Sequence, residues 1–189
     1  MNDGINILHI VLSLTGGVFA GLVYSLFTYP SGEVRKVLKE QVKMGYKYGQ
    51  WNHFRELVDH NFKKVVKPNC ETLYSTAFIR RKDGPYILEM PEFDSYFGFT
   101  FININTDIMG YITNRDTGRQ KVHRFIISYT GDDINEPGMQ GITIDSDICW
   151  IIGRYEINSP GDIKKVEPVQ DSLKLIKYQD YPGYARKEY

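Results

Sequence analysis

The chain opens with a long hydrophobic stretch, and its later part alternates between polar and apolar positions. No charged residue occurs between Asp3 and Glu33, and residues 5–27 read INILHIVLSLTGGVFAGLVYSLF. About 20 apolar residues suffice for a helix to cross the roughly 30 Å hydrocarbon core of a bilayer, and a helix satisfies its own backbone hydrogen bonds there. The pattern predicts a transmembrane anchor over residues 1–30 that ends at Pro30.

Three alternatives compete with a membrane anchor. A cleaved signal peptide is disfavoured, because the leading Met-Asn-Asp-Gly carries no basic residue and the apolar run is long. A helix lying on the membrane surface needs a charged face, which this stretch lacks. A helix buried in the core of a soluble protein is disfavoured because the run is long and uncharged, but it is the main competitor.

The basic residues that follow the span predict its orientation. Residues 33–67 hold nine basic and four acidic residues, whereas residues 68–189 hold fourteen basic and eighteen acidic ones. Positive charge next to a span favours the cytosolic side, so we expect a single-pass protein with its C-terminal domain in the cytosol. The charges nearest the span are also candidates for contact with anionic headgroups, or else they form an ordinary solvated helix. They are Arg35, Lys36, Lys39, Lys43 and Lys47.

Residues 31–64 read as a helical connector. Ser31 is positioned to cap a helix that carries Val34, Val37 and Leu38 at helical spacing. A second helical piece is predicted over residues 52–60.

From residue 65 to 177 the pattern favours strands. Period-two alternation and turn residues delimit seven segments: 72–80, 86–90, 95–105, 108–113, 122–129, 141–144 and 148–157. A switch of the apolar face near Phe101 suggests a β-bulge. Ser159-Pro160 opens a helix, and residues 178–189 read as an extended tail. We predict a mainly β fold, an antiparallel β-sandwich or barrel with flanking helices, behind one transmembrane helix.

Composition narrows the function without naming it. The 23 basic and 23 acidic residues balance, which argues against a nucleic-acid binder. Two cysteines cannot form a disulfide framework and fit a reducing compartment. No cofactor-binding motif occurs, and we expect no cofactor and no metal. Weak alternatives are zinc at His53, Glu56 and His60, a reactive Cys70, and a polar ladder at Asn103, Asn105 and Asp107.

Residues 65–79, VVKPNCETLYSTAFI, resemble the Pro-Asn-x-Asp-Thr-Leu-Tyr-Ser motif of the Domain of Unknown Function 1254 family. Residues 114–118 resemble the Arg-x-Thr-Gly turn of that family, and residues 150–154 its Trp-x-x-x-Arg strand. Asp162 and Gln170 match its closing helix. The resemblance covers roughly residues 50–176 and implies a β-rich fold but little chemistry. Glu71 replaces the usual Asp, and we do not expect the companion C-terminal domain that often follows in bacterial members.

The motif supplies the candidate site. Six polar residues either fix the strand entry through local bonds or line a ligand pocket, with a Glu71–Arg154 ion pair as one structural form. They are Asn69, Glu71, Thr72, Tyr74, Arg115 and Arg154.

We expect a membrane-anchored structural or interaction protein whose partners are a lipid bilayer and other subunits of a larger assembly. The lysine-, isoleucine- and tyrosine-rich style resembles copies in large DNA viruses of algae. On that resemblance the chain would be a minor capsid protein that links an internal membrane to the capsid shell. The alternative is a small-molecule binder or enzyme that uses the region from Asn69 to Tyr74.

Overall fold

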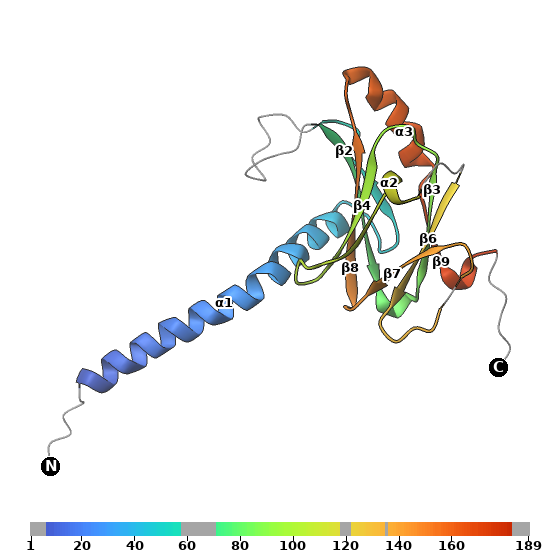
Figure 1. The fold of residues 1–189 in the computed structure, drawn as a ribbon. Coiled ribbons are helices and arrows are strands. Elements are labelled where there is room, and N and C mark those ends of the chain that lie inside the picture. Colours follow the sequence, from blue (N-terminus) through green and yellow to red (C-terminus); the bar gives the residue numbers. More distant parts are fainter. Residues whose placement is uncertain (1–6, 58–70, 118–121, 135, 183–189) are drawn as a thin grey trace, which may run out of the picture.

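Two stacked β-sheets and one long projecting helix make up the molecule (Figure 1). The computed structural model describes residues 7–57, 71–117, 122–134 and 136–182. The expected fold class, β-sheets with flanking helices behind an apolar N-terminal helix, is confirmed.

The N-terminal helix α1 spans Ile7–Lys43 without a break, so the expected helix end at Pro30 is wrong. A proline inside a helix lacks the N–H for one hydrogen bond and costs about 3 kcal/mol. Hydroxyl groups on either side bind nearby carbonyls: Thr28 donates to Tyr24 at 2.8 Å and Ser31 to Thr28 at 3.0 Å. The helix instead ends at Lys43, and the chain turns away at Gly45, whose φ of +90° suits glycine just after a helix end.

The first sheet has five strands in the order β1-β2-β8-β4-β5, and all its pairs are antiparallel. The strands are β1 Trp51–His53, β2 Thr72–Arg80, β8 Ile148–Glu156, β4 Phe97–Asn103 and β5 Ile108–Thr113. The helix expected over residues 52–60 is therefore wrong in its described part, because residues 51–53 pair with β2 as an edge strand. Residues 58–60 lie outside the described residues.

The second sheet has the order β7-β6-β3-β9. Its strands are β7 Gln140–Ile144, β6 Val122–Tyr129, β3 Tyr86–Pro91 and β9 Lys174–Lys177. β6 and β7 pair in parallel, which makes this sheet mixed rather than purely antiparallel. The predicted extended tail begins instead with a short 3₁₀-helix, Tyr178–Asp180.

Aromatic side chains from both inner sheet faces form the core. β4 shows strict alternation, with Phe97, Phe99 and Phe101 fully buried and the residues between them half-exposed. Each fully buried Phe contributes about 1.5–3 kcal/mol through removal of apolar area from water. The predicted bulge is confirmed, because the register between β4 and β5 shifts at Phe101 and Ile102.

Two short helices flank the sheets. α2, Asn114–Thr117, follows β5 directly. α3, Ile163–Asp171, begins after a capping box in which Ser159 and Asp162 bind each other's backbone. Val166 and Val169 of α3 are buried against the core.

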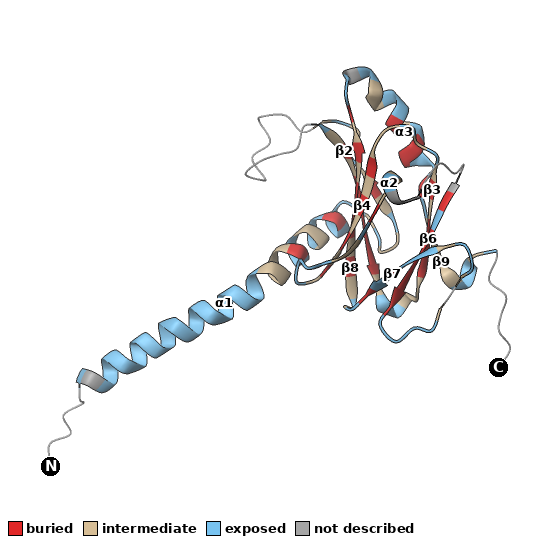
Figure 2. Ribbon diagram, viewed as in Figure 1, coloured by how far each residue is buried: buried red, intermediate tan, exposed pale blue. Residues whose placement is uncertain are grey.

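The two halves of α1 have opposite environments (Figure 2). Where described, residues 7–29 are exposed throughout. Val34 is only 1% exposed, and buried Gln41 donates a hydrogen bond to Thr76 Oγ1 on β2. Thr76 points away from the core, because Ser75 and Ala77 beside it point inward, so the C-terminal part of α1 docks on the outer face of the five-stranded sheet.

Gly153 on β8 provides a test of this packing. A Cβ placed on Gly153 would lie 2.7 Å from Phe99 Cε1, in the fully buried core. We expect Gly153→Ala to lower the free energy of unfolding by about 1–3 kcal/mol, because the Phe99 ring must shift. Urea denaturation of the full chain in detergent measures this loss.

Gly141→Ala on β7 is the matched control, since its Cβ would meet its nearest neighbour, Ile126 Cγ2, at 3.6 Å, which is an ordinary contact. Equal stability losses in the two variants would contradict the packing described for β8 and β4.

Candidate functional site

A buried polar network joins β1, β2 and α3. Gln170 Nε2 donates to Ser75 Oγ at 3.1 Å and to the Tyr74 carbonyl at 3.0 Å, and Ser75 Oγ lies 2.8 Å from His53 Nδ1. Burial lowers the pKa of His53 to about 4, so its imidazole is neutral at pH 7. With Gln170 already donating to Oγ, we assign the Ser75 hydroxyl as the donor to Nδ1.

Arg55 extends this network to the surface. Its guanidinium donates to Gln170 Oε1 at 2.9 Å and to the Glu167 carbonyl at 3.0 Å, and it pairs with Asp171. The segment after β1 is thus bonded to α3. Ser75 and Gln170 belong to the motifs that carry the family resemblance, so the sequence marked both as notable residues. Nothing in the sequence indicated His53 as their partner.

The Ser–His contact is structural rather than catalytic. Ser75 is 0% exposed, so its hydroxyl cannot reach a substrate. An imidazole with a pKa near 4 is also a weak base for a serine proton at neutral pH. The network satisfies polar groups that would otherwise be buried without partners, and it holds α3 against the sheet.

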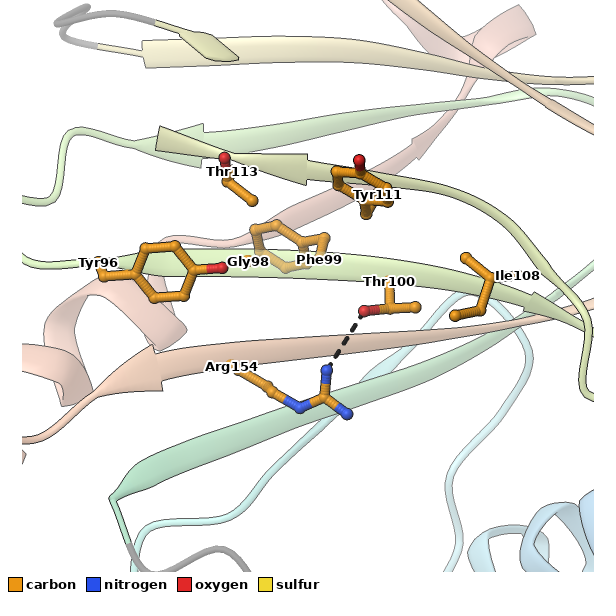
Figure 3. A pocket seen from close by; sticks show the side chains of 8 residues that line it. All are labelled: Tyr96, Gly98, Phe99, Thr100, Ile108, Tyr111, Thr113 and Arg154. Carbon is orange, nitrogen blue, oxygen red and sulfur yellow. Dashed lines mark hydrogen bonds between the residues drawn. The ribbon is translucent and has the colours of Figure 1, made fainter. Parts of the chain in front are cut away.

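A second polar place lies on the outer face of the five-stranded sheet. A pocket of about 170 Å³ lies over β4, β5 and β8 (Figure 3). Its strand residues meet across the sheet, because Gly98 pairs with both Arg154 and Thr113, and Thr100 pairs with Tyr111. The lining residues are Tyr96, Gly98, Phe99, Thr100, Ile108, Tyr111, Thr113 and Arg154.

Arg154 is the charged group of this pocket. Its Nη1 lies 3.3 Å from Thr100 Oγ1, as Figure 3 shows, and its guanidinium carbon is 5.7 Å from the centre of the Tyr74 ring. Arg115, from α2, lies over the Tyr96 ring at 5.6 Å. Three of the six candidate residues, Tyr74, Arg115 and Arg154, therefore gather around this pocket.

The other candidates lie elsewhere. Asn69 is outside the described residues. Glu71 is exposed, and its carbonyl accepts a hydrogen bond from Ile157 at 2.8 Å. No Glu71–Arg154 ion pair forms among the described residues, because Arg154 stands opposite Tyr74, three positions farther along β2. The Thr72 hydroxyl oxygen is shielded from solvent and has no hydrogen-bond partner in the described part of the chain.

The weaker chemical candidates do not form sites in the described residues. Asn103 is buried and shapes the β4–β5 turn, since its Oδ1 accepts from the backbone N–H groups of Asn105 and Asp107. No group of three or more His, Cys, Asp or Glu side chains lies close enough to hold a metal within residues 7–57, 71–117, 122–134 and 136–182. His60 and Cys70 lie outside these ranges. Burial raises the pKa of the Cys149 thiol to about 12, which makes it unreactive.

The basic residues of α1 share one side of the helix. Arg35, Lys36, Lys39 and Lys43 are exposed, whereas Val34 and Gln41 are buried. At about 100° per residue the four cations fall within a sector of roughly 100°, opposite the buried pair. We call these four residues the basic stripe. Lys47, the fifth predicted contact, is exposed and lies beyond the helix end.

The His53 network makes stability depend on pH. The pKa of His53 is about 4 in the folded chain and about 6.5 in the unfolded chain, so between these values only the unfolded chain takes up the proton. Stability is therefore lost as the pH falls from 6.5 to 4, and His53 contributes no such change above 6.5. We expect His53→Gln to lose less stability over this window, as measured by melting temperature.

His123 is the internal comparison, because burial lowers its pKa as well. A double variant, His53→Gln with His123→Gln, should flatten the profile further. An unchanged profile in His53→Gln would show that this imidazole is not kept neutral by the fold.

Two solved structures share this fold. The VPA0106 protein from Vibrio parahaemolyticus aligns with a TM-score of 0.66 and 16% identity, covering 85% of this chain and 38% of that one. A putative uncharacterized protein from Burkholderia cenocepacia aligns with a TM-score of 0.51 and 13% identity, covering 85% of this chain and 43% of that one. This chain thus spans well under half the length of either, and the likeness shows the fold alone.

No curated protein matches the chain. One family model matches residues 48–177, which hold the five-stranded sheet, the four-stranded sheet, the buried His53–Ser75–Gln170 network and the outer-face pocket. Because this match covers more than half of the sequence, the chain belongs to the DUF1254 family, described as proteins of unknown function.

Proposed function

We propose that the chain is a single-pass membrane protein that holds its β-domain at a fixed height and orientation beside a bilayer, where the domain binds other proteins. One observation carries the proposal: the exposed apolar part of α1 and its docked part form a single uninterrupted helix. The apolar part contains a window with a mean hydropathy of 1.9, and none of that window is buried in the fold. A core helix of a soluble protein would be buried instead.

The continuous helix sets the distance between the membrane and the domain. Val34 lies seven residues beyond Phe27, which corresponds to about 10 Å at 1.5 Å per residue. Each headgroup layer is roughly 5–7 Å thick. If the hydrocarbon core ends near Phe27, the sheet begins at the outer edge of the headgroups, without a flexible linker between anchor and domain.

The basic stripe fits this position. It begins eight residues after Phe27, and its side chains face away from the sheet that α1 covers. Arg35 and Lys36 lie nearest the headgroups, and a lysine or arginine close to an anionic membrane surface gains about 1 kcal/mol. We therefore place the β-domain on the cytosolic side, in line with the charge bias after the span.

The narrower expectation of a capsid link in a virus rests on the sequence style alone. Neither the family nor the two similar structures adds support to it, so the proposal is kept at a membrane-anchored interaction module. Its partners are a lipid bilayer and other protein subunits.

A charge placed in the exposed part of α1 tests the anchor. We expect Val18→Arg to cost about 2.5–3.5 kcal/mol of insertion free energy, because Val18 is fully within the apolar run. A carbonate wash should therefore release the variant from the membrane pellet, whereas the natural chain should stay in the pellet. Val42→Arg is the control, since Val42 is exposed on the same helix beyond the span.

If the full chain remains monomeric in solution without detergent, the proposal of a membrane anchor is wrong. It is also wrong if the Val18→Arg variant stays in the pellet as firmly as Val42→Arg.

Protease protection tests the orientation. In sealed inverted vesicles, whose cytosolic face points outward, we expect the β-domain to be digested and the apolar part of α1 to be protected. Replacing Arg35, Lys36, Lys39 and Lys43 together with Gln should weaken this preference, because the basic stripe supplies most of the positive charge next to the span. A β-domain protected in inverted vesicles would reverse the orientation.

A further inference from the structure

We propose that the outer-face pocket is a binding site for a phosphate ester, with Arg154 as the residue that holds the phosphoryl group. This inference goes beyond the anchoring function and does not depend on it, because the pocket lies wholly within the β-domain.

Arg154 forms no ion pair with a carboxylate within the described part of the chain. Three other arginines pair with carboxylates: Arg55 with Asp171, Arg80 with Asp83 and Arg124 with Glu89. Arg154 is half-buried, yet its guanidinium contacts only a hydroxyl, that of Thr100 at 3.3 Å, and the face of the Tyr74 ring among the described residues. A partly buried cation gains from an anionic partner, and the remaining N–H groups of this guanidinium are available to one.

The groups around Arg154 favour a tetrahedral anion over a flat carboxylate. The hydroxyl groups of Thr100 on β4 and Tyr96 before β4 line the same pocket as the Arg154 guanidinium on β8, and Tyr111 on β5 lines it with its ring (Figure 3). Donors that come from several strands match oxygens that point in several directions. Arginine also binds phosphate through two parallel hydrogen bonds.

The rim supplies a second positive charge and an apolar wall. Arg115 is exposed and lies over Tyr96, at the edge of the pocket. The Glu156 carboxylate also lies at this edge, where it accepts a hydrogen bond from the Tyr96 backbone N–H at 3.4 Å. Ile108 and Tyr111 are 62% and 66% exposed, so the organic part of an ester has an apolar surface to cover.

The pocket and α1 share the outer face of one sheet. Thr76, which binds Gln41 of α1, pairs with Ile152, and Ile152 pairs with Thr100 of the pocket. Two strand spacings separate Thr76 from Thr100, about 10 Å. The ester is therefore either a phospholipid headgroup beside the anchor or a soluble phosphate ester, and the chemistry that binds it is the same.

The first experiment uses the full chain in maltoside micelles, which contain no phosphate. Inorganic phosphate, added at matched ionic strength against chloride, should raise the melting temperature by binding the folded chain. We expect Arg154→Gln to weaken the apparent affinity about tenfold or more, because a hydrogen-bonded charge pair is lost. Thr100→Val, which keeps size and charge, should weaken it several-fold.

Arg81→Gln is the matched control. It removes a guanidinium just beyond the far end of β2. Along β8, the distance from Ile148 to Arg154 is six residue steps, or about 20 Å. The control should respond to phosphate as the natural chain does. An equal response in Arg154→Gln and Arg81→Gln, or no response in the natural chain, overturns the proposal; if Arg154→Gln fails to fold, Thr100→Val decides in its place.

The second experiment distinguishes the two sources. Short-chain phosphatidic acid added to the same micelles should displace inorganic phosphate from the natural chain. The displacement is measured by ³¹P NMR. Glycerol 3-phosphate is the soluble comparison. If phosphatidic acid displaces phosphate at a far lower concentration than glycerol 3-phosphate does, the site binds a lipid headgroup. If the two compounds act at similar concentrations, the site binds a soluble ester. Failure of both to displace phosphate contradicts the proposal, whereas the anchoring function is tested separately by Val18→Arg.

Discussion

The docking of α1 on the outer face of the five-stranded sheet is the contact on which the arrangement of the molecule depends. Val34 and Gln41 bury one side of the helix, and the Gln41–Thr76 hydrogen bond fixes its position against β2. Without this contact, Pro30 would be a natural place for the helix to end, since it costs about 3 kcal/mol inside one. The packing offsets that cost, and the exposed apolar part of α1 thereby continues into the docked part as one helix.

The two faces of the five-stranded sheet contain different features. The inner face contains the aromatic core and, at one end, the His53–Ser75–Gln170 network, whose polar atoms bond one another away from solvent. The outer face contains α1 and the pocket around Arg154. Neighbouring residues of one strand therefore belong to different faces. On β2, Ser75 belongs to the buried network, and Tyr74 lies beside Arg154 on the outer face. Polar motif residues in this family need not share one role.

Much of the β-domain was predictable from local pattern. The strands at 72–80, 108–113 and 122–129 have the bounds that alternation gave, and the bulge at Phe101 followed from a change of face. The two missed strands share one physical cause. β1 reads locally as helix, and β9 lies in a stretch without clear alternation, yet both pair along the edge of a sheet built from distant residues. Pairing at the edge of a sheet supplies backbone hydrogen bonds, and the local sequence preference for helix or strand does not indicate them.

The candidate site divides in the same way. The motif residues Tyr74, Arg115 and Arg154 were visible in the sequence, but their grouping with Tyr96, Thr100 and Tyr111 depends on the register of three strands. By itself, the sequence determined the apolar N-terminal helix, the charge bias after it and the alternating β-domain, because each follows from the order of neighbouring residues. Only the tertiary structure decided that the apolar helix continues into the domain and that Arg154 contacts the Thr100 hydroxyl rather than pairing with Glu71. Contacts between residues far apart in the chain follow from packing and register, which no local pattern specifies.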